Sequence, residues 1–319
     1  MKQTNFQRPQ GVIPAALMPF DSNLEIDPVA YQKHLRDLVS VDGISAITIN
    51  GHAAEVHALT LSEQKQSLYL AQETLDQKIP LIVGISTASS MVASQLARTA
   101  AEGGASALLV FPPDSMSLGG HQRPEMAIAH SERIVHQTNL PLILFQYPVS
   151  SGLAYPLPTL LELCHRFPTI RAIKDWCNNP VLHEQHIREP HALNPPVSVL
   201  STHSAWLLSS LVLGCDGLLS GAGSVIAHLH VRIWQAIQDE NLSLARAISD
   251  QLYHLSKAFY CDPLVDMHNR MKEALVLLGR LPSAYVRPPL LQLSTEELES
   301  IKRNLELAGL QTVNKSTPY

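Results

Sequence analysis

The chain has 319 residues, of which 45% are hydrophobic and 16% charged, so it can build a substantial core and is too apolar for a disordered protein. Its net charge is −5 and its lysines and arginines are scattered, which argues against binding to nucleic acid or to an anionic membrane. The N-terminus lacks a signal-peptide core and no apolar stretch reaches membrane-spanning length. We therefore expect a soluble, cytoplasmic protein. The four cysteines have no paired spacing, which predicts buried free thiols.

Apolar, strand-like runs alternate with amphipathic segments, beginning with a run at 11–17 and a helix at 28–40. The other predicted strands lie at 45–50, 80–85, 105–111, 141–146, 170–174, 197–201 and 217–220. The helices after them are predicted at 61–74, 90–102, 124–137, 157–165, 180–187, 205–213 and 225–239. Continuously apolar strands that alternate with helices favour parallel pairing with both faces covered.

Eight such strand-helix pairs predict an α/β fold of the (β/α)8 TIM-barrel type over residues 11–239. A doubly wound open sheet is the alternative, but no Gly-x-Gly-x-x-Gly turn follows the first strand. Residues 1–10 are interpreted as an N-terminal arm. Further helices at 241–255, 265–278 and 295–307 predict a C-terminal three-helix extension over 240–309, packed against the barrel or across a subunit boundary. Residues 310–319 are predicted to be a disordered tail.

Lys174 is the residue on which the functional interpretation depends. It ends a short apolar strand that begins after Phe167-Pro168 and stops before Asn178-Asn179-Pro180. Burial disfavours the charged form of a lysine, and a neutral amine attacks ketones to form a Schiff base. The structural alternative is a strand-end lysine that pairs with Asp175 or another carboxylate.

Active sites of TIM barrels are built from residues at the carboxyl ends of the strands. Besides Lys174, the only lysine among the predicted strand ends, the candidates there are Gly51, His52, Ala53, Phe145, Gln146, Tyr147, His203, Ser220, Gly221, Ala222 and Gly223. The turn at 221–223 lets the backbone approach a ligand, and its amides could hold a carboxylate. An ordinary strand-helix turn explains the same residues equally well.

Taken together, these residues resemble the dihydrodipicolinate synthase and N-acetylneuraminate lyase family of Schiff-base barrels. The resemblance covers nearly the whole chain, from Gly11-Val12-Ile13-Pro14-Ala15 through Asn50-Gly51 and Glu55 to Ile173-Lys174-Asp175 and Gly217 onward. It implies that Lys174 forms an imine with pyruvate or another 2-oxo acid, and that the protein is a homo-oligomer, either a tetramer or a dimer. Because the imine itself stabilises carbanionic charge, we expect no metal and no other cofactor.

The chain departs from the family pattern around this lysine. His52 and Ala53 stand where the family has two adjacent hydroxyl residues, and Phe145 replaces a proton-transferring tyrosine. Ser150 stands where the synthase has an arginine that binds the carboxylate of its aldehyde substrate, and Pro113-Asp114 replace a tyrosine supplied to the dimer partner. A phenylalanine cannot transfer a proton, so another group must do so.

His52, Tyr147 and His203 are the candidate replacements, because histidine titrates near neutral pH and tyrosine carries a transferable proton. Each has a structural alternative: His52 as a loop residue bonded to backbone, Tyr147 as a packing residue, and His203 as a solvated loop residue. Glu55 is interpreted mainly as an acceptor for backbone amides of its loop.

A metal site is a weaker interpretation. His183 and His186 could share a helix face with Glu189 as a third ligand, but Pro190 predicts that the helix ends before Glu189. A solvated polar face is the alternative interpretation of these histidines.

The sequence therefore predicts a Schiff-base-forming lyase, of aldolase or dehydratase type, that acts on a small-molecule 2-oxo acid such as pyruvate. The amides of His52-Ala53 and of Gly221 to Ser224 would bind the carboxylate, and His52 or Tyr147 would move protons. Gln146, Ser151-Gly152 and the 220–223 turn suggest a more specific alternative, a dehydratase of 2-oxo-3-deoxy sugar acids. A catalytically silent protein that binds 2-oxo acids is the other alternative.

Overall fold

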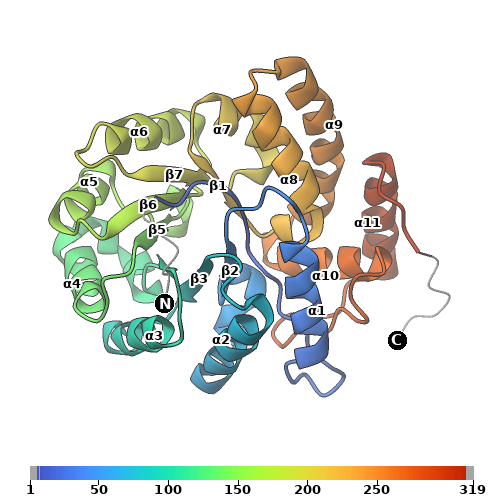
Figure 1. Ribbon diagram of the computed structural model, residues 1–319, viewed down its shortest axis with the longest axis horizontal. Helices are drawn as coiled ribbons and strands as arrows, with labels where there is room; N and C mark the ends of the chain where they lie inside the picture. Colours follow the sequence, from blue (N-terminus) through green and yellow to red (C-terminus); the bar gives the residue numbers. More distant parts are fainter. Residues whose placement is uncertain (1–5, 7, 314–319) are drawn as a thin grey trace.

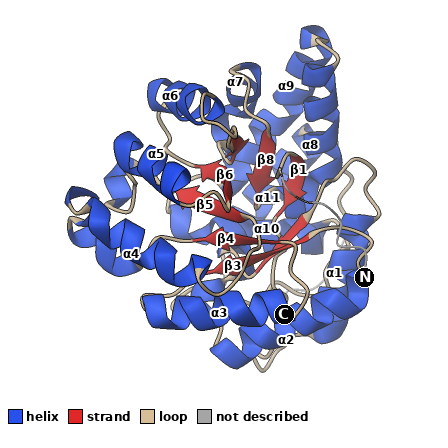
Figure 2. Cartoon of the chain, turned by 60° about the vertical axis from the view of Figure 1, so that its left-hand side comes forward, coloured by secondary structure: helices blue, strands red, loops and turns tan. Residues whose placement is uncertain are grey.

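The computed structural model describes residue 6 and residues 8–313, and it contains a barrel of parallel strands surrounded by helices (Figures 1 and 2). The strands are β1 (Gly11–Pro14), β2 (Ile47–Ile49), β3 (Leu81–Ile85), β4 (Ala107–Val110), β5 (Leu142–Gln146), β6 (Ile170–Asp175), β7 (Ser198–Ser201) and β8 (Gly217–Ser220). They form one eight-stranded sheet in the order β1-β8-β7-β6-β5-β4-β3-β2. Parallel bridges from Val12 to Ile44 and from Ala15 to Thr48 join its two ends. The prediction of a closed (β/α)8 barrel is confirmed.

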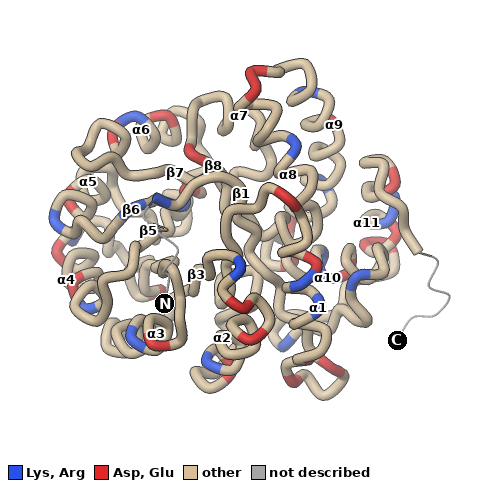
Figure 3. Tube along the Cα trace, in the orientation of Figure 1, with Lys and Arg blue, Asp and Glu red and all other residues tan. Residues whose placement is uncertain are grey.

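The helices between the strands lie outside the barrel (Figure 2). They are α1 (Pro28–Val39), α2 (Leu61–Leu75), α3 (Ser90–Glu102), α4 (Pro124–Val135), α5 (Leu157–Arg166), α6 (Pro180–His191), α7 (Leu207–Val212) and α8 (Gly223–Gln238). Local sequence sets several of their starts. Thr60 and Glu63 form a capping box on α2, and Asp27 caps α1 with Pro28 in its first turn. Acidic and basic residues are interspersed over these outer helices (Figure 3).

The strands are buried almost without interruption, because helices cover one face and the barrel interior covers the other. Arg171 alone among the strand residues is only partly buried. The continuously apolar runs therefore marked the strands correctly, although most runs extended slightly beyond the hydrogen-bonded residues.

Helix α6 differs from the sequence prediction, since it continues through Glu189 and Pro190 to His191. Pro190 is buried in the last turn, and its carbonyl accepts hydrogen bonds from the amides of Leu193 and Val197. Those contacts join the end of the helix to the approach of β7. Tertiary packing thus outweighs the local preference of the residue before a proline.

The C-terminal extension consists of α9 (Leu242–Phe259), α10 (Met267–Leu277) and α11 (Thr295–Leu307), and it packs on the barrel of the same chain (Figure 1). Ile248, Phe259 and Met271 share one apolar core cluster with Val12 and Leu218 of the barrel. Between α9 and α10 the chain returns to the mouth of the barrel, which places residues of the extension beside the strand ends.

The last described residues of the chain pack against the C-terminal extension. Residues 310–313 form no helix, but the amide of Val313 donates to the carbonyl of Leu277, at 2.8 Å. The rest of the predicted tail, 314–319, and most of the predicted arm, residues 1–5 and 7, lie outside the described residues. Among the helices of the described residues, none combines the length and the apolar character that crossing a membrane requires.

Candidate active site

A narrow pocket of about 30 Å³ lies at the carboxyl ends of the strands, where TIM barrels carry their active sites. Lys174 lines it together with residues from several strand ends and from the C-terminal extension. The full lining is Ala15, Gly51, His52, Ala53, Leu109, Phe145, Lys174, Trp176, Thr202, Gly221, Tyr260, Met267 and His268.

Lys174 is 5% exposed and projects from β6 into this pocket. Among the described residues its amine has no hydrogen bond and no ion pair. Its nearest recorded partner is the ring of Phe145, whose centroid lies 3.9 Å from Nζ. Burial lowers the pKa of Lys174 to about 7, so a large fraction of the amine is uncharged at neutral pH. The predicted alternative, an ion pair with Asp175, is wrong.

His52 and Tyr147 form a hydrogen-bonded pair beside Lys174. The Tyr147 hydroxyl lies 2.6 Å from Nε2 of His52, and the His52 ring also contacts the rings of Phe111 and Phe145. Burial, and then the nearby charge of Lys174, lower the pKa of His52 well below its usual value, while burial raises that of Tyr147. The tyrosine therefore keeps its proton and can donate it to a neutral imidazole.

Tyr147 lies just beyond β5 on the same side as Phe145, with their ring centroids 4.4 Å apart. Strand residues two apart share a face, and this alternation continues past the last hydrogen-bonded residue. A phenolic hydroxyl is thus present near the lysine even though Phe145 carries none.

The other predicted residues divide into two groups. Gly51, Ala53, Phe145 and Gly221 line the pocket with Lys174 and His52. The rest lie outside its lining: Gln146, Tyr147, His203, Ser220, Ala222 and Gly223.

Two of the residues outside the lining have clear structural contacts. The side chain of Gln146 bonds to the backbone of Tyr155 in both directions, donating to its carbonyl at 2.8 Å and accepting from its amide at 3.0 Å. A side chain at Gly223 would collide with the backbone of Pro14, so this glycine permits close packing of α8 on β1.

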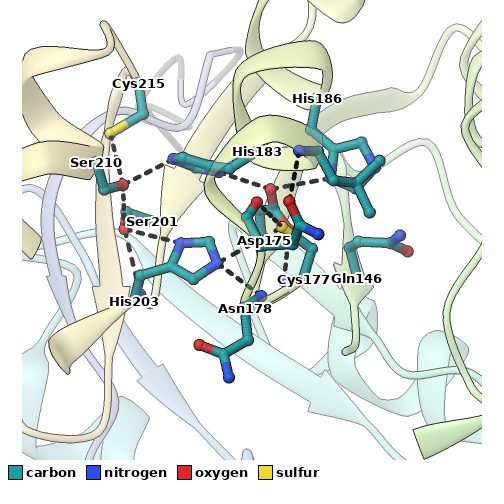
Figure 4. A network of polar contacts seen from close by, with 12 residues as sticks. Gln146, Asp175, Cys177, Asn178, His183, His186, Ser201, His203, Ser210 and Cys215 are labelled. Atoms are coloured by element: carbon teal, nitrogen blue, oxygen red, sulfur yellow. Dashed lines mark hydrogen bonds and ion pairs between the residues drawn. The ribbon is translucent and has the colours of Figure 1, made fainter. Parts of the chain in front are cut away.

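On the other side of β6, Asp175 is the centre of a buried polar network (Figure 4). One carboxylate oxygen accepts from Nδ1 of His183 at 2.7 Å and from Nδ1 of His186 at 3.0 Å. The other accepts from the amide of Cys177 at 2.9 Å. Both histidines are fully buried, so their interpretation as a solvated polar face is wrong. The helix face carrying them packs on the barrel because Asp175 supplies their acceptor.

His203 also belongs to this network, and its interpretation as a solvated loop residue is wrong. Its Nε2 accepts from the amide of Asn178 at 3.2 Å, and its ring stacks on Trp206. Ligand atoms of Asp175, Cys177, His183 and His203 lie within 4.8 Å of one another, as metal ligands can. Each of the four is already engaged in hydrogen bonds within the protein.

Glu55 forms a buried ion pair. The Glu55 carboxylate pairs with the buried ammonium of Lys272, and its only recorded bond to a backbone amide is a long one, 3.5 Å, to Arg287. It therefore joins the loop after β2 to α10, chiefly through an ion pair.

Cys164, Cys177 and Cys215 are buried free thiols as predicted, whereas Cys261 is exposed because it lies in the turn after α9.

Seven lining residues were not among the predicted candidates: Ala15, Leu109, Trp176, Thr202, Tyr260, Met267 and His268. Trp176 could have been found, because it lies two residues after Lys174 and alternation places it on the same face. Tyr260, Met267 and His268 carry no comparable signal, since the packing of the extension alone brings them to the barrel mouth.

Comparisons with known proteins agree with this architecture. Residues 8–308 match the model of the dihydrodipicolinate synthetase family. The putative 2-dehydro-3-deoxy-D-gluconate aldolase YagE of Escherichia coli is 24% identical over 93% of this chain and 96% of its own. The 4-hydroxy-tetrahydrodipicolinate synthase of Persephonella marina is 27% identical over 94% of this chain and 99% of its own.

Solved structures have the same fold. The crystal structure of YagE in complex with pyruvate superposes with a TM-score of 0.88 at 22% identity, covering 95% of this chain and 99% of that one. The dihydrodipicolinate synthase of Aquifex aeolicus gives a TM-score of 0.85 at 23% identity, covering 96% of this chain and 100% of that one. With its family match over most of its length, this chain belongs to the dihydrodipicolinate synthetase family.

Proposed function

We propose that this protein is a class I lyase in which Lys174 forms a Schiff base with the C2 carbonyl of a pyruvate-like 2-oxo acid. The observation that carries the proposal is the buried amine of Lys174, which lines a pocket and forms no ion pair with any acid of the described residues. An uncharged amine is the nucleophile that imine formation requires. Relatives named as synthases and as an aldolase support the same chemistry.

The bound 2-oxo acid would place its carboxylate against the backbone at the floor of the pocket. Gly51, Ala53 and Gly221 line that region, and none of them presents a bulky side chain to the ligand. The amides of His52 and Ala53 open a short 3-10 helix that has no side-chain cap, so their N–H groups can bind an anion.

His52 and Tyr147 would move the protons. The neutral imidazole would accept a proton from the C3 carbon of the imine, and the tyrosine hydroxyl, 2.6 Å from Nε2, would orient the ring and return a proton later. This pair would replace the tyrosine that is absent at Phe145. Gln146, His203, Ser220, Ala222 and Gly223 would support the site from behind instead of touching the substrate.

Reductive trapping tests the proposal. Borohydride added with pyruvate should fix one adduct on each chain, detectable as an increase in intact mass. An unchanged mass across a panel of 2-oxo acids, with a known Schiff-base aldolase trapped in parallel, would contradict it.

Two other functions follow from particular observations. The likeness to YagE, named as a putative sugar-acid aldolase, leaves open a dehydratase or aldolase of 2-oxo-3-deoxy sugar acids. Phe145 beneath the amine favours a silent binding protein, because the ring that the amine contacts cannot transfer a proton. Thermal stabilisation by 2-oxo acids without adduct or turnover would select the silent protein.

We also propose a cytoplasmic homo-oligomer, a tetramer or a dimer, on the basis of the family resemblance. Light scattering on the purified protein measures the assembly directly, and a monomeric mass at micromolar concentration would contradict this expectation.

A further inference from the structure

We infer that the preferred aldehyde partner of this site is uncharged and apolar or aromatic, so that the site joins pyruvate to such an aldehyde or releases one by cleavage. This inference rests on the proposed function, because it concerns the part of the substrate that extends beyond the imine at Lys174. The charge of the pocket lining and the composition of its walls carry it.

Charge comes first. Within the described residues, the pocket lining contains no arginine, no acid and no lysine besides Lys174. Two cations outside the lining, Lys272, whose charge acts on His268, and Arg287, whose charge acts on Lys272, are engaged with other groups. Arg287 donates to Glu63 and to the carbonyls of Leu24 and Ala58, while Lys272 pairs with Glu55. A second carboxylate or a phosphate on the substrate would be buried without a counter-charge, which is unfavourable.

The walls are aromatic and apolar. Phe145 and Trp176 line the pocket with ring centroids 6.3 Å apart, and Tyr147 packs against both from outside the lining, with centroids 4.4 and 6.0 Å away; these three rings are here called the aromatic wall. Trp176 is only partly buried and lies on the same strand face as Lys174, so it flanks any group attached to the amine. The C-terminal extension adds Tyr260 and Met267. Rings and thioethers of this kind favour contact with flat, apolar groups.

The few polar groups on these walls suit neutral oxygens. His268 has no hydrogen bond among the described residues, and its Nε2 lies 3.1 Å from the point where a Cβ at Gly221 would stand. Burial, and then Lys174, lower the pKa of His268 to about 3, so this imidazole is neutral. It can bond to one hydroxyl or carbonyl oxygen but cannot neutralise an anion.

The reaction balances without another reagent. The amine of Lys174 condenses with pyruvate and releases water, and a proton leaves C3 to His52, which gives the enamine. C3 then attacks the aldehyde carbon, and the new alkoxide takes the proton back from His52. Water hydrolyses the imine, which releases a 4-hydroxy-2-oxo acid and restores the amine. Cleavage is the same sequence in reverse.

An aldehyde panel tests the inference. Purified protein is incubated with pyruvate and benzaldehyde, glyceraldehyde or succinic semialdehyde, and the condensation products are quantified by mass spectrometry. We expect kcat/KM for benzaldehyde to exceed that for either of the others at least tenfold. Faster reaction of the charged or the hydroxylated aldehyde, or a pyruvate adduct on Lys174 with no turnover of benzaldehyde, would overturn the inference and leave the Schiff base intact. Absence of any pyruvate adduct would instead overturn the proposed function.

Variants locate the selectivity. Trp176→Ala should lower the ratio of kcat/KM for benzaldehyde to that for glyceraldehyde about tenfold, and Trp176→Phe should retain most of it. Trp234→Ala removes an indole from α8, outside the pocket lining, and should leave the ratio unchanged. An unchanged ratio in Trp176→Ala would overturn the assignment of selectivity to the aromatic wall.

Discussion

Lys174 and Asp175 are neighbours on β6 and are both buried, yet their ionisable groups have different partners. Burial alone would raise the pKa of Asp175, but hydrogen bonds from His183 and His186 hold it below its usual value. In the part of the chain that the structure describes, the amine of Lys174 contacts an aromatic ring and no acid, and burial lowers its pKa to about 7. The carboxylate has its full set of partners inside the protein, whereas the amine remains available to a ligand. We take this difference as the separation of a structural residue from a reactive one.

Removing the amine of Lys174 should have the largest effect on turnover. Lys174→Met keeps most of the buried volume but has no nucleophile, so we expect turnover of any 2-oxo acid substrate to fall by at least about 10³-fold. Steady-state kinetics with the best substrate of the panel measure the loss. Residual activity within tenfold of the parent would show that the lysine is not the nucleophile.

Removing the carboxylate of Asp175 should instead lower the stability of the fold. Asp175→Asn leaves His183 and His186 buried without their charged acceptor, and we expect the free energy of unfolding to fall by about 3–5 kcal/mol. Urea unfolding of this variant beside Lys174→Met provides the comparison. A loss below about 1 kcal/mol would mean that the network in Figure 4 is not a structural centre.

The hydroxyl of Tyr147 should matter less than the amine but more than other buried hydroxyls. Tyr147→Phe removes the partner of His52 and should lower kcat about 10²-fold, the usual contribution of one positioned proton-transfer group. Tyr155→Phe is the matched control, because it removes a buried tyrosine hydroxyl outside the pocket lining. Equal losses in the two variants would remove Tyr147 from the mechanism.

The rate of adduct formation should depend on pH as expected for an amine with a pKa of about 7. Between pH 6 and pH 8 the uncharged fraction rises about tenfold, so the trapping rate at fixed pyruvate should rise by a similar factor. Quenched-flow trapping with intact-mass detection measures it. A rate that keeps rising with the same slope to pH 10 would indicate a solvated lysine.

The smallest effect concerns the pH dependence of stability. The pKa of Lys174 is lower in the folded state than in the unfolded chain, so between pH 7 and about 10.5 the unfolded state binds more protons and stability rises with pH. Below pH 7 the penalty for burying this lysine is fully present. The stability advantage of Lys174→Met should therefore shrink by about 1 kcal/mol from pH 7 to pH 8. A constant difference would contradict the lowered pKa.

The sequence predicted the elements and the place of Lys174 at a strand end well, because both depend on short-range patterns. Apolar runs punctuated by proline, glycine and asparagine located all the strands, and the order of strands then placed Lys174 at the mouth of the barrel. Alternation along β6 is also sufficient to place Trp176 on the same face as Lys174.

The parts that the sequence did not predict depend on contacts between distant segments. His268 and Tyr260 reach the pocket only because the extension folds back over the barrel, and no local pattern encodes that return. His183, His186 and His203 were interpreted as solvated because a lone histidine shows no partner in the sequence. Asp175 provides that partner, directly for the first two, from a different element. Burial of polar residues is therefore the feature that local reasoning predicts least well.

Peptide mapping after reductive trapping tests the central claim most directly. Protein treated with pyruvate and borohydride at pH 8 is digested, and the modified lysine is identified by tandem mass spectrometry. We predict a single adduct on Lys174 and none on Lys272, the other buried lysine, whose ammonium is held by Glu55. An adduct on Lys272 or on surface lysines, with Lys174 unmodified, would contradict the account.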